Sequence, residues 1–146
     1  MKLSRYFTLE ELIASQTAER RGIDNTPPPA AMANLETLAR KLDEVRTLLG
    51  RPVYISSGYR SPALNTAIGS KTSSAHLLGL AADIVVPAFG KTMDVFEAIR
   101  NSGIRYDQLI AEYPAGASGG WVHFGLGDRR RQQALVYNGK QYSEVV

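Results

Sequence analysis

The sequence predicts a single compact domain of the α+β class, in which N-terminal helices pack against a mostly antiparallel sheet. Two observations lead to this prediction. Apolar residues recur at helical spacing within residues 1–50, whereas residues 51–146 contain several short β-branched and aromatic segments. A chain that begins with helices and continues with strands, with few helices inserted among the strands, is typical of this class. A length of 146 residues fits one domain, made of a helical N-terminal part (residues 1–50) and a core (residues 51–146).

The first predicted element is a short helix that begins after Thr8. Thr8 and Glu11 have the spacing of a capping box, and Phe7 and Leu12 have that of a hydrophobic staple. We expect this helix to end near Thr17. Three prolines at residues 27–29 then predict a rigid, extended connector.

A longer helix is predicted from about Ala31, and Gly50 is suited to end it. Its apolar residues at helical spacing are Leu35, Leu38, Leu42, Val45 and Leu49. We expect both N-terminal helices to pack the fold and to carry no chemistry.

After residue 50 the pattern changes to strands. Strands are predicted over residues 52–56, 83–86, 106–113, 121–126 and 133–137. Short helices are predicted over residues 63–68 and 92–100, and residues 114–120, rich in Gly, Ala, Pro and Ser, predict a hairpin loop.

The composition excludes several classes of protein. No segment has the length of a membrane span, and residues 1–7 lack the apolar stretch of a secretion signal, so we expect a chain made in the cytoplasm. Without cysteine, a metal site has to use imidazole and carboxylate ligands. The net charge of +3 and the run of Arg129, Arg130 and Arg131 indicate a solvated turn or a polyanion contact. We do not expect nucleic-acid binding, because basic and aromatic residues do not alternate in a stripe.

His76 and His123, the only two histidines, stand in unusual surroundings. A polar loop precedes His76, and small residues lead from it to Asp83 at the head of an apolar strand. A desolvated carboxylate needs a partner, which could be a cation, the end of a turn or an arginine. His123 interrupts an apolar strand, which implies that one face of that strand is functional.

Two imidazoles and one carboxylate leave the fourth position of a tetrahedral zinc ion free, as in catalytic zinc sites. We therefore predict one Zn²⁺ ion held by His76, Asp83 and His123 in the core part of the chain.

Three motifs resemble one known family. They are Ser-Gly-Tyr-Arg-Ser at residues 57–61, Ser-x-His-x-x-Gly-x-Ala-x-Asp at residues 74–83 and Trp-Val-His at residues 121–123. Together they resemble the zinc D-Ala-D-Ala carboxypeptidase and L-Ala-D-Glu endopeptidase family, and residues 7–12 resemble its phage-associated branch. The resemblance implies the same three zinc ligands, a peptidoglycan peptide as substrate, and a role for Arg60 in binding substrate or steadying the oxyanion.

Chemistry also favours a role for Arg60. A guanidinium beside zinc can clamp a carboxylate or neutralise an oxyanion, although a surface arginine in a turn is the alternative. Ser57, Tyr59 and Trp121 are further candidates for substrate binding; Ser57 and Tyr59 could instead be turn and packing residues.

Hydrolysis also needs a general base, and with both histidines assigned to zinc a carboxylate has to serve. The resemblance suggests a glutamate three residues before the last histidine, or a histidine two residues before it. Those positions are Gly120 and Trp121 here, so the nearest acidic candidates are Glu112 and Asp107.

Strand alternation favours Glu112 as the base. A register that pairs Glu112 with His123 puts both on one face of the sheet. The apolar pairs that follow from this register are Ala111 with Phe124 and Leu109 with Leu126. A glutamate exposed at a strand end is the alternative. Asp107 would face the other way, and we expect it in a turn or a salt bridge.

These expectations combine into a monomeric zinc peptidase that cuts peptidoglycan stem peptides as a carboxypeptidase or an endopeptidase. It would reach the wall after release, as a phage endolysin does. The alternative is a wall-binding or virion structural module that keeps zinc without hydrolysis, motivated by the missing glutamate at Gly120.

Overall fold

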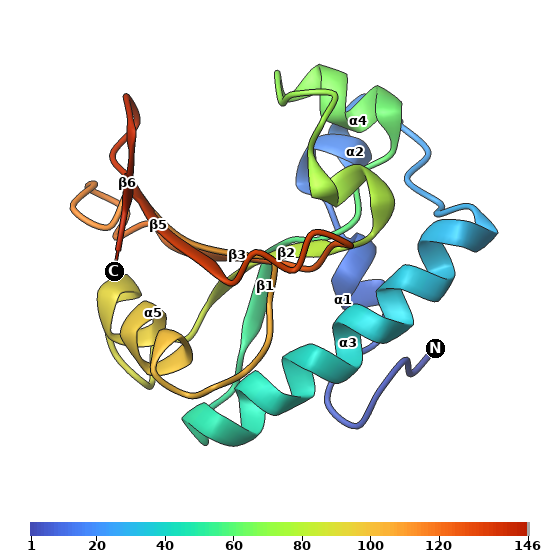
Figure 1. The fold of residues 1–146 in the computed structure, drawn as a ribbon. Coiled ribbons are helices and arrows are strands. Elements are labelled where there is room, and N and C mark those ends of the chain that lie inside the picture. Colours follow the sequence, from blue (N-terminus) through green and yellow to red (C-terminus); the bar gives the residue numbers. More distant parts are fainter. Residues whose placement is uncertain (146) are drawn as a thin grey trace.

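A six-stranded sheet forms the centre of the computed structural model, which describes residues 1–145 (Figure 1). The strand order is β1-β2-β4-β3-β5-β6, and every neighbouring pair is antiparallel except β3 and β5. The strands are β1 (Tyr54–Ser57), β2 (Ala81–Val85), β3 (Gln108–Glu112), β4 (Trp121–Gly125), β5 (Gln133–Tyr137) and β6 (Tyr142–Glu144). The predicted α+β class and the mostly antiparallel sheet are confirmed.

The helices lie before and between the strands. They are α1 (Leu9–Ile13), α2 (Gln16–Arg21), α3 (Pro29–Leu49), α4 (Pro62–Ala67), the 3₁₀ helix η1 (Ala75–Leu78) and α5 (Thr92–Arg100). Among the described residues, no helix is both long and apolar enough to cross a membrane.

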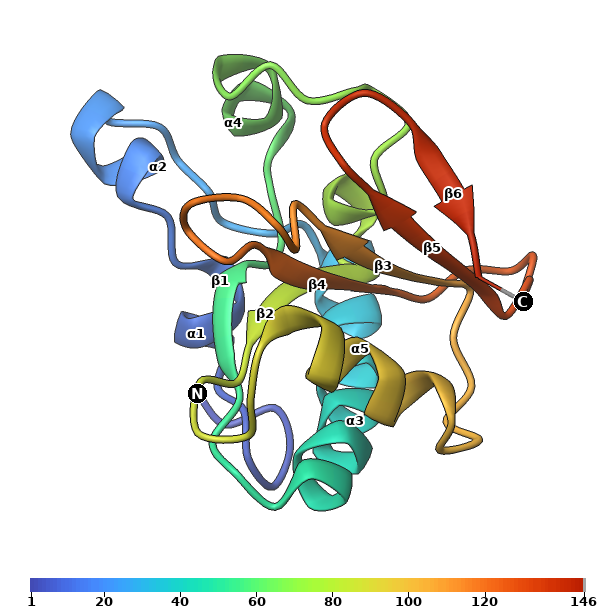
Figure 2. The same ribbon diagram turned by 90° about the vertical axis from the view of Figure 1, so that its left-hand side faces the viewer.

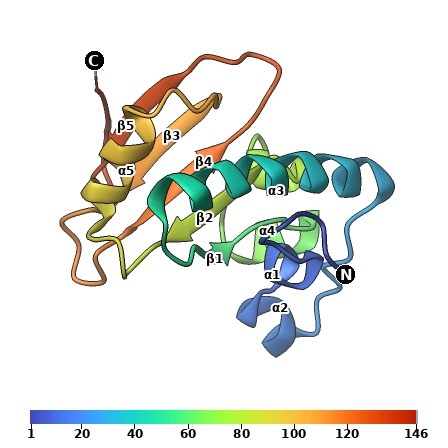
Figure 3. The same ribbon diagram turned by 90° about the horizontal axis from the view of Figure 1, so that it is seen from below.

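Helices α3 and α5 cover one face of the sheet, which we call the covered face. Both lie below the sheet in Figures 1 and 2 and in front of it in Figure 3. Their buried side chains meet those of alternate strand residues, which leaves the opposite, open face for other uses. The strand residues buried on the covered face are Ala82, Ile84, Leu109, Ala111, Val122, Phe124 and Ala134.

The N-terminal helix differs from the prediction at its end. The capping box of Thr8 and Glu11 is present, but α1 stops at Ile13. The reason is a second cap, because the Ser15 hydroxyl accepts a hydrogen bond from Ala18 N and starts the separate helix α2. The long helix and its end at Gly50 are as predicted.

The β3–β4 hairpin is present, but the predicted register is wrong. Glu112 pairs with Trp121, and His123 pairs with Ile110, so the strands are shifted by two residues. The apolar pairs are Leu109 with Phe124 and Ala111 with Val122. Because side chains repeat every two residues, the shift keeps Glu112 on the same face as His123.

Three further local differences concern the site and the C-terminus. β2 begins at Ala81, so Asp83 lies in the middle of the strand instead of at its head. His76 lies in η1 and not in an open loop. Strand β6, which the sequence did not predict, pairs with β5 at the edge of the sheet.

Candidate metal centre

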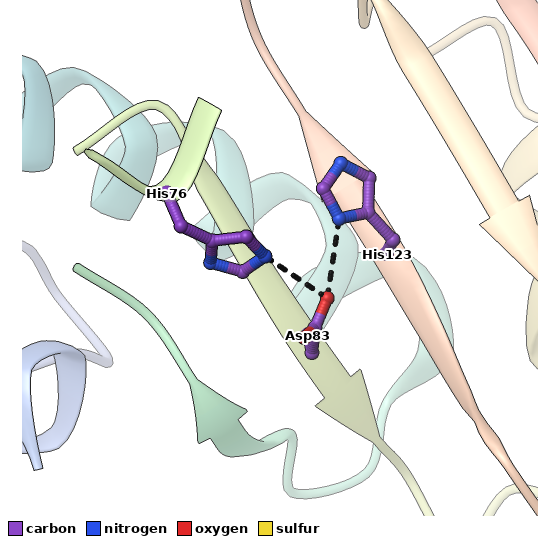
Figure 4. A group of neighbouring side chains, drawn as sticks. All are labelled: His76, Asp83 and His123. Carbon is purple, nitrogen blue, oxygen red and sulfur yellow. Dashed lines mark hydrogen bonds and ion pairs between the residues drawn. The ribbon is translucent and has the colours of Figure 1, made fainter. Parts of the chain in front are cut away.

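Three side chains meet on the open face of the sheet (Figure 4). Asp83 Oδ1 lies 3.3 Å from His76 Nε2 and 3.2 Å from His123 Nδ1. One possible ligand atom from each residue lies within 4.8 Å of the other two. His76 and Asp83 are buried and His123 is nearly so. The sequence-predicted ligands are therefore brought together.

Strand pairing and a short helix position these three groups. Asp83 on β2 and His123 on β4 are register partners, so their side chains emerge side by side. His76 comes from η1, whose N-cap Ser74 accepts a hydrogen bond from His76 N at 3.2 Å. Gly79 ends η1 with φ +74°, and a Cβ there would lie 2.7 Å from the Ala31 carbonyl oxygen of α3. Only glycine therefore lets η1 pack this closely on α3.

A hydrogen bond fixes the orientation of the His76 ring. His76 Nδ1 lies 2.7 Å from the carbonyl oxygen of Gly58 and donates to it, because a carbonyl can only accept. In the neutral form of the ring, which is the form that binds a metal, the lone pair is then on Nε2, the atom that faces Asp83. A backbone carbonyl that holds the second nitrogen is the usual partner of a metal-ligating histidine.

The cluster has the chemistry of a zinc site. Burial by itself would raise the pKa of Asp83, but its interactions with the His123 and His76 side chains outweigh burial and hold that pKa well below its usual range. Asp83 is thus an anion between two imidazole nitrogens. One carboxylate and two imidazoles match the three-ligand set of catalytic zinc sites, so the residues present fit the ion.

Arg60 lies beside the cluster. Its Nη2 atom is 3.7 Å from Asp83 Oδ2, and the residue is only 8% exposed, so it is not the surface arginine of the alternative reading. Ser57 Oγ accepts from Nε at 3.2 Å, and Asn65 Oδ1 accepts from Nη1 at 3.2 Å. Burial lowers the pKa of Arg60, while the charges of Asp83 and Glu112 raise it, and a guanidinium in this setting stays a cation.

Glu112 lies on the same face as His123. Its Oε2 atom accepts a hydrogen bond of 3.0 Å from Trp121 Nε1. Burial raises the pKa of Glu112, and the negative charge of Asp83 raises it further, against His123 and the Trp121 hydrogen bond, which lower it. A carboxyl group with a raised pKa is suited to accept and return a proton near neutral pH.

These groups line one open cleft of about 750 Å³. Its lining includes all three residues of the cluster, together with Arg60, Glu112 and Trp121. A possible metal site, a cation and a carboxyl group with a raised pKa therefore share one solvent-accessible space.

Comparison with protein families gives a match to the Peptidase M15 model over residues 5–123. The chain belongs to this family. It is the family of zinc D-Ala-D-Ala carboxypeptidases, as the resemblance predicted, and its members are zinc-dependent. A comparison with curated proteins gave no match.

In this M15 chain the geometry of Gly120 explains why the family's glutamate is absent there. Gly120 has φ +73°, and a Cβ at this position would lie 2.1 Å from the Glu112 carbonyl oxygen and 2.5 Å from that of Tyr113. No side chain fits without moving the hairpin backbone. On the paired strand, Glu112 lies opposite Trp121.

The three predicted substrate-binding residues that remain, Ser57, Trp121 and Tyr59, lie in three different surroundings in the M15 chain. Ser57 lies opposite Asp83 after a β-bulge in β1, and its hydroxyl contacts Arg60. Trp121 lines the cleft. Tyr59 is only 3% exposed and belongs to the core cluster, and its N–H donates to the carbonyl oxygen of Leu12.

Sequence reasoning missed two asparagines that support the M15 site. Asn65 accepts from Arg60 and donates to the Lys71 carbonyl oxygen at 3.0 Å, so it ties the arginine to the loop before η1. Asn25 donates to the carbonyl oxygen of Tyr59 at 3.0 Å and accepts from Ser61 N at 2.7 Å. Neither residue stands in a spacing pattern, so only its hydrogen bonds in the folded chain reveal its role.

Proposed function

We propose that this M15 chain is a zinc metallopeptidase that hydrolyses peptide bonds in peptidoglycan stem peptides. One zinc ion would be held by His76, Asp83 and His123. The observation that carries the proposal is the convergence of their ligand atoms within 4.8 Å in a cleft that is also lined by Arg60 and Glu112. Residues 1–146 would work as one peptidase domain.

The zinc ion, when bound, supplies Lewis-acid chemistry, which acidifies water and polarises a carbonyl group. Glu112 is the general base of this proposal. Its carboxylate takes a proton from the attacking water and returns it to the leaving amine. The indole of Trp121 holds one carboxylate oxygen, Oε2, and leaves the other to meet water.

Arg60 supplies a fixed positive charge. Ser57 and Asn65 each hold one of its nitrogens, so the guanidinium is oriented before substrate arrives. In this position it can neutralise the negative oxygen that forms on the attacked carbonyl, or bind a substrate carboxylate. Trp121 would contact the peptide from the cleft wall. Ser57 would act through Arg60, and Tyr59 would support the Arg60 turn from the core.

The test combines metal analysis with digestion of purified sacculi and mass spectrometry of the fragments. We expect about one zinc ion per chain, and loss of both zinc and hydrolysis after treatment with a chelator. Release of single D-Ala residues would identify a carboxypeptidase, and release of longer peptides an endopeptidase. A chain that takes up no zinc, or zinc-loaded protein that leaves sacculi intact, would overturn the proposal.

The second candidate is a wall-binding or virion structural module that keeps zinc without catalysis. Its main support was the absence of a glutamate at position 120. Because the hairpin backbone excludes any side chain there, and Glu112 lines the cleft, that absence no longer favours loss of activity. Action on the wall after release, as in phage lysis, belongs to the proposal and would be tested by adding the purified protein to intact cells.

A further inference from the structure

Four strands of the open face place one side chain each in a single row. Trp121 pairs with Glu112, Glu112 with Tyr137, and Tyr137 with Tyr142. Neighbouring strands lie about 4.8 Å apart, so the row spans about 14 Å across the sheet. It begins two residues from His123 on β4, which is about 7 Å along the strand.

The aromatic members of this row are connected through a further ring, that of Tyr113. The rings of Tyr137 and Tyr142 stack with centroids 4.3 Å apart, and the ring of Tyr113 lies 5.3 Å from that of Trp121 and 5.4 Å from that of Tyr137. All four residues line the cleft of the metal cluster. Tyr142 is 50% exposed and Tyr113 is 38% exposed. We call Tyr113, Trp121, Tyr137 and Tyr142 the aromatic wall.

The backbone at Tyr113 adopts an unfavourable conformation to hold this wall in place. Tyr113 has φ +51°, a left-handed conformation that is unfavourable for a bulky residue. Its N–H donates to the Tyr137 carbonyl oxygen at 2.8 Å. Gly139, in the turn between β5 and β6, lies so close that a Cβ there would be 2.9 Å from the Tyr113 ring. A strained residue is thus fixed from two sides while its ring stays partly exposed in the cleft.

We propose that the aromatic wall binds a sugar ring of the glycan strand to which the stem peptide is attached. This inference rests on the proposed function. The electron-rich face of an aromatic ring attracts the polarised C–H groups on the flat face of a pyranose. Phenolic hydroxyls beside the rings can hydrogen-bond sugar hydroxyls.

The position of the wall favours sugar over peptide as its occupant. The wall continues directly from Glu112, so one substrate molecule can occupy the wall and the metal cluster together. The row of about 14 Å matches about four residues of extended peptide, and a stem peptide can therefore join a sugar on the wall to the metal cluster. Small and charged side chains of a stem peptide offer no flat apolar face to cover several aromatic rings. A sugar does.

Trp121, the only tryptophan of the chain, reports on the wall directly. Titration of the purified, zinc-loaded protein with a tetramer of β-1,4-linked N-acetylglucosamine should change its fluorescence in a saturable way. Tyr142→Ala should weaken this binding about tenfold, because it removes one stacking face. Tyr142→Phe keeps the ring and should retain most of the affinity. Tyr54→Ala removes a similarly exposed tyrosine from the opposite edge of the sheet and should leave oligosaccharide binding unchanged.

A second measurement compares kcat/KM for a stem peptide with and without its disaccharide. Wild-type protein should prefer the sugar-bearing substrate, and Tyr142→Ala should move the ratio toward one. The sugar site is overturned by a wild-type titration that does not saturate, by equal affinity of Tyr142→Ala and wild type, or by equal cleavage of both substrates. Saturable oligosaccharide binding without hydrolysis of either substrate would support the sugar site and overturn the proposed peptidase function.

Discussion

The two faces of the sheet are built from the same short strands but serve different purposes. On β4, Val122 and Phe124 point to the covered face and are almost fully buried, whereas Trp121 and His123 point into the cleft. In β3, Leu109 and Ala111 join the core, and Glu112 lines the cleft. Strand alternation therefore lets adjacent residues hold the fold and carry the chemistry. Substitutions one residue apart should separate stability from activity.

The largest effect on the open face is expected from His123→Ala. Removing one of three ligands should abolish stable zinc binding and lower kcat/KM by about 10⁴-fold, or about 5.5 kcal/mol of barrier. The free energy of unfolding of the zinc-free protein should change little in comparison. Metal analysis, peptide hydrolysis and urea unfolding measure the three quantities. Retention of wild-type zinc affinity would remove His123 from the ligand set.

Glu112→Gln tests the base without removing a ligand. The amide keeps the shape and can still accept the Trp121 hydrogen bond, but it cannot take a proton from water. We expect zinc content to stay at the wild-type level and kcat to fall by about 10²–10⁴-fold. Glu144→Gln, an exposed glutamate on β6, is the matched control and should keep full activity. Normal turnover of Glu112→Gln would assign the base elsewhere.

On the covered face, Phe124→Ala should act on stability. Phe124 is fully buried and contacts Tyr106 with ring centroids 6.2 Å apart, so truncation leaves a cavity worth about 3–5 kcal/mol in the free energy of unfolding. Zinc content per folded chain should be unchanged, although His123 is the preceding residue. Urea unfolding and metal analysis of the folded fraction decide this. A loss below 1 kcal/mol would show that the covered face tolerates voids.

The two faces also differ in what their sequence could predict. The candidate zinc ligands follow from two histidines and an aspartate in unusual surroundings. The shared face of Glu112 and His123 follows from strand alternation, which survives an error of two residues in the register. The register itself depends on the left-handed conformations of Gly119 and Gly120, which the composition of a loop does not specify. The end of α1 was similarly decided by a local cap at Ser15.

Contacts between distant segments were outside the reach of sequence patterns. The aromatic wall exists because β5 pairs in parallel with β3, a crossover that places Tyr137 opposite Glu112. Strand β6 has only three residues and carries no alternation long enough to detect. The hydrogen bond of Asn65 to Arg60 likewise depends on how α4 folds back on the turn before it. Hydrophobic periodicity and helix caps predict the individual helices and strands. The order of the strands and the buried polar contacts depend on how these elements pack.

Asp107 is an exception to the division between a covered face for stability and an open face for chemistry. It lines the cleft, but its role is structural. Arg131 donates to its carboxylate from the backbone N–H at 3.0 Å and from Nε and Nη2 at 2.9 Å, as the predicted salt bridge requires. These side-chain hydrogen bonds lower the pKa of Asp107 against the opposing effect of burial.

A carboxyl group with a lowered pKa in the folded state contributes stability above its unfolded pKa of about 3.9, and this contribution is lost as the pH falls through the folded value. With Arg131 partly exposed to solvent, we expect Asp107→Asn to cost about 1 kcal/mol or less at pH 7, and the difference from wild type to shrink toward zero below pH 3. Urea unfolding at both pH values measures it, with Asp128→Asn, an exposed aspartate of the same loop, as the control for charge. A cost that stays constant across this range would mean that the amide is tolerated poorly for its shape, and that the ion pair itself adds nothing to the fold.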